Sequence, residues 1–424
     1  MSQSDTIRAD PLRGWAATII PVRTWAAAAI FVAVTSLLLY RSSLGGLELR
    51  DFRDAVYYPV VSLLDGNNPY DTASYFRTYP VEQEFPPYLP HLLTLHLPFG
   101  LLPFQIAQVL YFAMTAALTV VLAVVTLRAC DLAASSACTF GLATLLILSR
   151  PGYWNIAMGQ VSVPVAIGTY WALRYADERV WWAAWGLAVA LCKPTYGVPL
   201  TVLLLARGAT PVIIRGGLIT AVLAAGPTLA LLYAAGGPLR FAAAIQESYL
   251  NFAADPSAGA ATSPDRVDAV SVVARILGHN PTTAVTLLIA VIIIGATALA
   301  VWSLNPTRDR NTRALSNSVA CLGILTFAYH QAYDLVLLVL PLTALATGLA
   351  LPPGRLRWIA LAALALPPIN YLSSRIGLSF VAVNGPLRVA LLSSNGIALL
   401  IALCILLAWS ARSRSANVSS PPTA

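Results

Sequence analysis

Long apolar runs, separated by shorter polar segments, dominate the pattern of hydrophobic and polar positions along the chain. A membrane-spanning helix needs roughly 20 mostly apolar residues, with a range of about 17–25. The pattern therefore predicts about twelve transmembrane helices. They cover residues 24–43, 105–127, 134–149, 155–174, 180–192, 195–207, 211–235, 281–303, 314–329, 333–350, 356–371 and 388–409.

Two polar loops, about residues 44–104 and 236–280, are much longer than the other connections. Within the first loop, residues 88–103 are apolar, but the stretch is short and broken by prolines, which is typical of an interfacial or re-entrant segment. We therefore expect an all-α polytopic membrane protein whose long first extracytoplasmic loop carries short interfacial helices. In this prediction residues 24–411 form a single transmembrane domain, between a cytoplasmic segment, 1–23, and a disordered cytoplasmic tail, 412–424.

The composition excludes soluble, disordered and fibrous proteins. Hydrophobic residues make up 58% of the 424 residues and charged residues only 10%, and the mean hydropathy is +0.72. A soluble domain is typically about 25% charged. Because so few charges cannot cover the surface of a soluble particle of 45.0 kDa, the lipid bilayer has to be the solvent for most of the chain.

The basic residues indicate orientation rather than nucleic-acid binding. The net charge is +8, but the basic residues form no stripe and no stacking aromatic residues lie between them, so we expect no nucleic-acid partner. Cytoplasmic loops of membrane proteins collect Arg and Lys, and the clusters Arg308/Arg310/Arg313 and Arg412/Arg414 fit that rule. We expect a multi-pass protein of the cell membrane, with both termini in the cytoplasm and both long loops outside.

Seven of the eighteen acidic residues lie in the first long loop. Two of them, Asp51 and Asp54, directly follow the first predicted helix and would share one face of a helix, because they are three positions apart. A partly desolvated carboxylate just above the bilayer can have a raised pKa and act as a general base. The alternative is a solvated loop start in which each aspartate pairs with Arg50 or Arg53.

Lys193 is the only lysine among 26 basic residues, and Lys193-Pro194 separates two unusually short predicted helices. Proline breaks helices, and a broken helix at membrane depth is tolerated only against protein or a water-filled cavity, so this pair of helices can line a site. The ammonium group suits phosphate binding as a point charge. The alternative is a side chain that reaches to the membrane interface.

Other polar residues stand at predicted helix ends. Gln160 begins one predicted helix, where it would either join helices or bind a ligand. His330 and Asp334 are four apart and can pair, and ionisable residues within membrane segments are functional by default. Arg150 lies at an outer helix end. Metal-site and nucleotide motifs such as HExxH, CxxC, the P-loop and GxGxxG are absent from the sequence, so ATP and nicotinamide chemistry have no support in it.

Five segments together resemble glycosyltransferase family 87, in order and in spacing against the predicted helices. This family has the GT-C architecture and includes polyprenol-phosphate-mannose-dependent mannosyltransferases and arabinofuranosyltransferases. The segments are Asp51-Phe…Tyr57-Tyr58…Gly66-Asn-Asn-Pro-Tyr70; Phe85-Pro-Pro-Tyr88 with the following Leu97-Pro-Phe-Gly-Leu-Leu-Pro103; Gly159-Gln160; Gly186 to Lys193-Pro194; and Tyr329-His330…Tyr333-Asp334-Leu…Pro341. The resemblance spans roughly residues 24–350.

The resemblance implies a GT-C-like enzyme that transfers a sugar, first of all mannose, from a polyprenyl-phosphate donor to a glycolipid or glycan acceptor, with inversion and on the extracytoplasmic side. An acid just after the first helix serves as general base in such enzymes, which places Asp51 first. The spacing from Asp51 to the loop glycine is one residue longer here, so Asp54 stays an alternative.

Enzymes that use lipid-phosphate sugars commonly need no metal, so the resemblance also implies that no metal is needed, and we expect no cofactor. The remaining roles follow from the resemblance or from position. Lys193 and His330 would bind the donor phosphate by resemblance, and Arg150 is a further candidate for that phosphate from position. Tyr57, Tyr58, Tyr88, Gln160 and Asp334 would contact substrate, although interfacial tyrosines also anchor proteins in membranes.

Three other functions stay open. An arabinofuranosyltransferase would use polyprenyl-phosphate-arabinose as its donor. A transporter or flippase of lipid-linked sugars should have internal repeats and paired broken helices in both halves, whereas the sequence has one broken pair. A non-catalytic assembly subunit would not need the aspartate.

Overall fold

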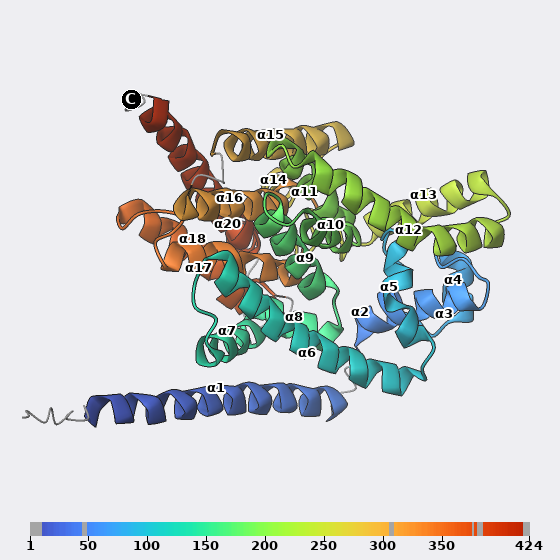
Figure 1. Cartoon of the computed structure of the whole chain (residues 1–424). Helices are drawn as coiled ribbons and strands as arrows, with labels where there is room; N and C mark the ends of the chain where they lie inside the picture. Colours follow the sequence, from blue (N-terminus) through green and yellow to red (C-terminus); the bar gives the residue numbers. More distant parts are fainter. Residues whose placement is uncertain (1–10, 45–48, 305–308, 375–376, 380–384, 419–424) are drawn as a thin grey trace, which may run out of the picture.

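A computed structural model of the chain describes residues 11–44, 49–304, 309–374, 377–379 and 385–418. These residues form helices and no strands, apart from an isolated antiparallel bridge between Arg266 and Gln331 (Figure 1). The α-helices are α1 (Pro11–Leu44), α2 (Arg50–Phe52), α3 (Tyr58–Leu64), α4 (Thr72–Thr78), α5 (His91–Gly100), α6 (Phe104–Ala129), α7 (Ser136–Leu148), α8 (Arg150–Met158), α9 (Ser162–Tyr175), α10 (Val180–Leu191), α11 (Pro194–Ala206), α12 (Thr210–Ala234), α13 (Pro238–Ala254), α14 (Ala269–Leu277), α15 (Thr283–Leu304), α16 (Arg310–Phe327), α17 (Val339–Ala346), α18 (Arg355–Ile369) and α20 (Gly385–Val418). The described residues also form a π-helix, η1 (Arg53–Tyr57), and two 3₁₀-helices, η2 (Ala332–Leu338) and η3 (Tyr371–Ser373).

Within the described residues, five helices are long and apolar enough to cross a membrane. They contain the spans Val22–Tyr40, Phe104–Ala129, Thr210–Ala234, Thr283–Leu304 and Gly385–Arg412. Helices α7, α10 and α11 and the pair η2–α17 are apolar but shorter. The all-helical membrane architecture is thus confirmed, whereas the number of twelve spans stays a prediction.

The predicted span 155–174 is not one helix. It is divided between α8 and α9 by Gly159, whose φ of +71° lies in the left-handed region. This conformation ends α8, because a left-handed residue cannot continue a right-handed helix. The predicted break at Lys193-Pro194 is present, since α10 ends at Leu191 and Pro194 begins α11.

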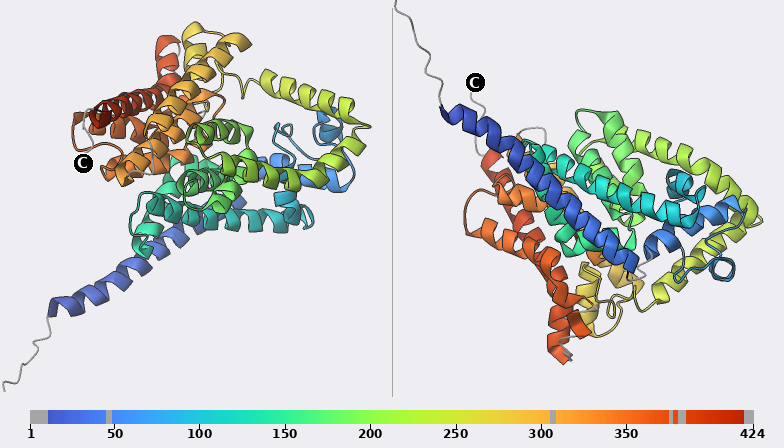
Figure 2. Two further views of the ribbon diagram at one scale, coloured as in Figure 1. Left: turned by 45° about the horizontal axis from the view of Figure 1, so that its top comes forward. Right: turned by 90° about the horizontal axis from the view of Figure 1, so that it is seen from below.

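Helix α1 packs against α7 along the edge of the helical body, and its N-terminal end protrudes from that body (Figure 2). Helices α9, α10, α16 and α17 lie in the body, and α9 packs against α6 and α10. At the other side, the first-loop helices α3 and α5 lie against α12, and α13 contacts α4. The predicted cytoplasmic segments fall partly outside the described residues, which begin at Pro11 and end at Val418; the described part of the tail, 412–418, continues α20.

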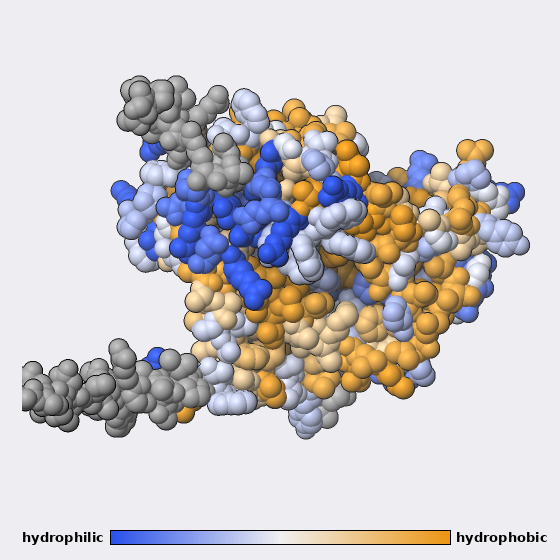
Figure 3. Space-filling model, viewed as in Figure 1, coloured by the Kyte–Doolittle hydropathy of each residue, from blue (hydrophilic) through white to orange (hydrophobic). Residues whose placement is uncertain are grey.

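One end of the helical body carries a network of ion pairs. The ion pairs join acidic and basic side chains at distances of up to 3.9 Å. The acids are Asp131, after α6, and Glu178, after α9; the bases are Arg174, in the last turn of α9, and Arg310 and Arg313, in the first turn of α16. Hydrophilic residues gather on this side of the surface, near α16 and α18, while the region of α6 and α12 is mainly hydrophobic (Figure 3). Arg308 of the predicted Arg cluster lies outside the described residues.

Candidate functional site

A cavity of about 780 Å³ opens at the opposite ends of the same helices. Gln160 precedes α9, Lys193 precedes α11 and Tyr329 follows α16, whereas the ion-pair network lies at or beyond the far ends of α9 and α16. The two long loops supply the other walls. Their lining residues include Arg50, Asp51, Arg53, Ala55, Glu82, Gln83, Glu84, Pro86, Pro87 and Tyr88 from the first loop, and Tyr249, Phe252, Asp255, Ser257 and Asp265 from the second.

Asp51 lines this cavity with both carboxylate oxygens held by side-chain amides. Gln83 Nε2 donates to Oδ1 at 2.6 Å, and Gln160 Nε2 donates a short hydrogen bond to Oδ2. The guanidinium of Arg50 is 3.8 Å from Oδ1. Burial raises the pKa of the Asp51 carboxyl above its ordinary value, although the hydrogen bonds from both glutamines and the charge of Arg50 oppose this rise.

Asp54 does not line the cavity, and its carboxylate is fully committed to the protein. It pairs with Arg53 at 2.6 Å, and Oδ2 accepts the backbone N–H groups of Glu82 and Gln83, both at 3.1 Å. Its side chain has no exposed surface. The two aspartates, which the sequence left as alternatives for one role, therefore occupy different environments.

Local sequence explains how Asp51 and Gln160 meet. The left-handed Gly159 turns the chain after α8, and a Cβ at this position would lie 2.6 Å from the Cβ of Phe52. Phe52 follows Asp51 in α2 and stacks on Tyr111 of α6, with ring centroids 4.3 Å apart. Only glycine permits both this backbone conformation and this approach, so Gly159 brings the neighbouring Gln160 against the first loop.

The turn after α2 is a π-helix. In η1 the backbone N–H of Tyr58 bonds to Arg53 O, five residues back. A π-turn holds one residue more than an α-turn and is common at functional sites. The additional residue of this turn lies between Asp51 and the loop glycine, Gly66, and matches the one-residue longer spacing noted after Asp51.

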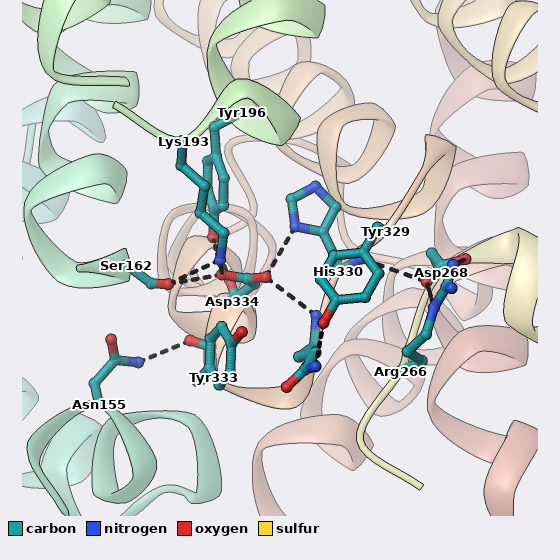
Figure 4. Close-up of polar contacts among 11 residues, drawn as sticks. Asn155, Ser162, Lys193, Tyr196, Arg266, Asp268, Tyr329, His330, Tyr333 and Asp334 are labelled. Carbon is teal, nitrogen blue, oxygen red and sulfur yellow. Dashed lines mark hydrogen bonds and ion pairs between the residues drawn. The ribbon is translucent and has the colours of Figure 1, made fainter. Parts of the chain in front are cut away.

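Lys193 lines the cavity, and its ammonium group forms an ion pair with Asp334 (Figure 4). Nζ lies 2.5 Å from Asp334 Oδ1 and 4.6 Å from the ring centroid of Tyr333. Asp334 also accepts hydrogen bonds from Ser162 Oγ at 2.7 Å and from Tyr196 Oη at 3.2 Å. Asp334 itself is fully buried and does not line the cavity, so its contact with the cavity is indirect, through the Lys193 side chain that it holds.

His330 lies behind this ion pair. Its Nδ1 is 3.1 Å from Asp334 Oδ2, and since a carboxylate only accepts, Nδ1 carries the proton. The buried Nε2 has no hydrogen-bond partner among the described residues. The backbone of His330 is held by the second long loop, because its N–H points to Asp268 at 3.4 Å and its carbonyl accepts the N–H of Val267 at 3.0 Å.

Arg150 does not line the cavity. Its fully buried guanidinium donates to Asp265 Oδ1 at 2.8 Å, to Ser373 Oγ at 2.6 Å and to the carbonyl of Asn370 at 2.9 Å. Asp265 does line the cavity. Arg150 thus ties the second long loop to the start of α8 and to η3.

Of the three tyrosines expected to contact substrate, one lines the cavity and two do not. Tyr88 is buried and lines the cavity. Tyr57 and Tyr58 do not, and they pack on one another and on Phe104 in an aromatic cluster, where Tyr57 Oη donates to the carbonyl of Leu102 at 2.9 Å.

Several lining residues had no signal in the sequence. Gln83, Glu84 and Tyr249 come from the long loops, whereas Tyr329 and Tyr333 stood in one of the segments that resemble the family but were given no role. The enrichment of acids and tyrosines in the first loop was the signal available, and it did not specify which of them face inward. Among the described residues, no group of three or more His, Cys, Asp or Glu side chains is arranged to hold a metal ion.

The model of glycosyltransferase family 87 matches residues 86–328, which is more than half of the chain. Curated proteins and solved structures gave no match. The matched region contains Gln160, Lys193 and the second long loop. With the helices that can cross a membrane, it confirms the resemblance found in the sequence and the prediction of an enzyme: the chain belongs to glycosyltransferase family 87, a family of glycosyltransferases, and is a membrane protein.

Proposed function

We propose that this enzyme transfers a sugar, mannose first of all, from a polyprenyl phosphate to a hydroxyl group of a glycolipid or glycan, with inversion at the anomeric carbon. The observation that carries this proposal is that the Asp51 carboxylate and the Lys193 ammonium line the same cavity. One is a base and the other a cation, as the transfer of a sugar from an anionic leaving group requires.

The step itself is a displacement. The acceptor oxygen forms a bond to the anomeric carbon while the bond from that carbon to the phosphate oxygen breaks. The acceptor proton goes to Asp51, and the electron pair of the broken bond leaves with the polyprenyl phosphate. The raised pKa of Asp51 makes it a stronger base than an ordinary aspartate, and the leaving phosphate needs positive charge rather than a proton donor.

Lys193 is the residue that we assign to the donor phosphate. Asp334 fixes the direction of its ammonium group, and His330 fixes Asp334 through its Nδ1. His330 and Asp334 therefore serve the donor by holding Lys193, with the Nε2 of His330 left as a further hydrogen-bonding group. Arg150 serves through Asp265, whose loop forms part of the cavity wall.

The acceptor is assigned to the wall formed by Glu84 of the first loop and by Tyr249 and Phe252 of α13. Aromatic faces and carboxylates together suit a neutral sugar, because the rings cover its apolar face and the carboxylates accept its hydroxyl protons. Burial and, after it, the negative charge of Asp255 raise the pKa of Glu84. Because the carboxylates at this wall repel an anionic phosphate, the donor phosphate is favoured at the Lys193 side instead. Tyr88, four residues after Glu84, lines the same cavity.

The cavity faces the extracytoplasmic side in this proposal. The basic ion-pair network at the opposite helix ends supports this orientation, because Arg-rich ends stay in the cytoplasm. The donor is then a lipid of the outer leaflet, and both termini are cytoplasmic in the cell membrane.

A transfer assay tests the function. Purified full-length protein receives polyprenyl-phosphate-mannose or polyprenyl-phosphate-arabinose together with a membrane glycolipid extract, and the labelled product is measured. We expect transfer from the mannose donor and its loss in Asp51→Asn. Transfer from the arabinose donor alone would replace mannose by arabinofuranose, and full activity of Asp51→Asn would refute the assignment of the base.

A further inference from the structure

A chain of hydrogen bonds joins the two aspartates of the first loop through Gln83. Asp54 Oδ2 accepts the backbone N–H groups of Glu82 and Gln83, each at 3.1 Å. The side-chain amide of Gln83 then donates from Nε2 to Asp51 Oδ1 at 2.6 Å. One aspartate therefore holds the backbone of Gln83, and the side chain of Gln83 holds the other aspartate.

We infer that Asp54 and Gln83 are positioning residues for Asp51, with Asp54 fixing the turn at residues 82–83 and Gln83 orienting the carboxylate toward the acceptor hydroxyl. This inference rests on the proposed role of Asp51 as the base. It gives Asp54 a function other than the one that its place in the sequence suggested, and it gives Gln83 a role that no feature of the sequence indicated.

The carboxylate of Asp51 needs such support. Rotation about χ2 of an aspartate is soft, and α2, which carries Asp51, has only three residues before the π-helix begins. The Arg50 guanidinium, at 3.8 Å, is beyond hydrogen-bonding distance. The amides of Gln83 and Gln160, one on each oxygen, are therefore the contacts that fix the plane of the carboxylate.

The same two contacts leave the base free to react. Each carboxylate oxygen has two lone-pair sites, and each amide occupies one of them. The remaining sites are available to the acceptor hydroxyl on the cavity side. Because amide N–H groups favour the charged form of a carboxylate, they also oppose the effect of burial and keep Asp51 available as an anion.

The turn that carries Gln83 is held from two directions. Asp54 binds its backbone, and Arg53, which pairs with Asp54, also reaches the Glu82 carboxylate at 3.2 Å. Tyr75 Oη donates to the backbone carbonyl of Asp54 at 2.8 Å and thereby anchors the aspartate itself. The turn at residues 82–83 is thus held by Asp54 through its backbone and by Arg53 through the Glu82 side chain.

The test compares kcat, the KM for the donor, and the pH dependence of kcat/KM for the full-length protein and four variants. The variants are Gln83→Ala, Asp54→Asn, the combination of the two, and Asp71→Asn as the matched control. Asp71 also lies in the first loop and accepts a backbone N–H, from Ser74 at 3.0 Å, but it does not line the cavity.

We expect Gln83→Ala to lower kcat roughly ten- to hundredfold, as for other losses of orientation, with little change in the donor KM. The hydrogen bond from Gln83 lowers the pKa of Asp51. Its loss in Gln83→Ala should therefore raise that pKa and move the acidic limb of the pH profile to higher pH. Asp54→Asn should also lower kcat, and the kcat of the double variant should resemble that of the more severe single variant, because both substitutions act on one path. Asp71→Asn should match the unmodified protein in the position of the acidic limb.

An unchanged kcat and an unchanged acidic limb in Gln83→Ala would overturn the inference, as would effects of the two substitutions that multiply. If Asp54→Asn does not fold, the result for Gln83→Ala alone tests the inference, because the Gln83 side chain is only partly buried and its loss is tolerated more easily. Loss of activity in Asp51→Asn together with an unaffected Gln83→Ala would refute the positioning role alone, whereas an active Asp51→Asn would refute the proposed base.

Discussion

The ammonium nitrogen of Lys193 lies 2.5 Å from Oδ1 of Asp334, although 141 residues separate the two in the sequence. Both side chains are almost completely buried, with 4% and 0% of their surface exposed. Removing one partner of a buried pair leaves an uncompensated charge and costs about 3–5 kcal/mol, whereas replacing both partners is often neutral. This contact therefore lets stability and function be separated.

We expect Asp334→Asn to lower the thermal stability of the detergent-solubilised protein, since Lys193 then lacks its counter-charge. The double variant Lys193→Met/Asp334→Asn should recover most of that stability but not the transfer activity, because the phosphate has lost its cation. Thermal unfolding followed by size-exclusion chromatography, and the transfer assay, provide the two measurements. Recovery of activity in the double variant would contradict the role of Lys193.

The pH dependence of kcat/KM should report Asp51. The base acts only when it is deprotonated, so activity is lost as pH falls through its pKa. Because burial raises that pKa, the acidic limb should have its midpoint above that of an ordinary aspartate, which is about 3.9. A kcat/KM profile with its limb at or below that value, in a protein shown to stay folded there, would contradict the assignment.

Gly159→Ala should disrupt the contact between Gln160 and Asp51. Alanine at a φ of +71° is strained, and its Cβ would lie 2.6 Å from the Cβ of Phe52. We expect a loss of roughly 1–3 kcal/mol in stability and a larger loss of kcat than in Gly141→Ala, a helical control with open space around its Cβ position. Equal behaviour of the two variants would show that the turn does not matter for transfer.

Glu84→Gln should weaken acceptor binding more than donor binding. The carboxylate has no hydrogen bond or ion pair among the described residues and lines the cavity, so it is available to sugar hydroxyls. Losing a charged hydrogen bond costs about 1.5–3 kcal/mol, so the acceptor KM should rise roughly tenfold or more. Glu247→Gln on the exposed face of α13 is the matched control, and a selective rise in the donor KM would place the donor at this wall instead.

Membrane orientation is measurable with substituted cysteines in a protein whose own cysteines are replaced. His279→Cys, exposed after α14, should react in intact cells with a maleimide that does not cross the membrane. Arg355→Cys, exposed at the start of α18, should react only after permeabilisation. The reverse pattern would place the cavity on the cytoplasmic side and exclude an outer-leaflet donor.

Local sequence was sufficient for the helical membrane architecture. Apolar runs predict membrane helices because, in lipid, each helix satisfies its own backbone hydrogen bonds. The break at Lys193-Pro194 was visible because proline acts on its own segment. The split between α8 and α9 was missed, because a single glycine in an apolar run does not show that its φ is positive, whereas Gly159 adopts a φ of +71°.

The candidate site was predictable as a set of residue types but not as an arrangement. Asp51, Gln160, Lys193 and Tyr88 were identified from their positions and from the family resemblance, and all four line the cavity. The sequence alone determined that this is a helical membrane protein with scarce charges at helix ends, because hydropathy acts locally. Only the tertiary structure decided that Asp51 faces the cavity while Asp54 supports the Gln83 turn, because that choice depends on hydrogen bonds from residues about thirty positions away.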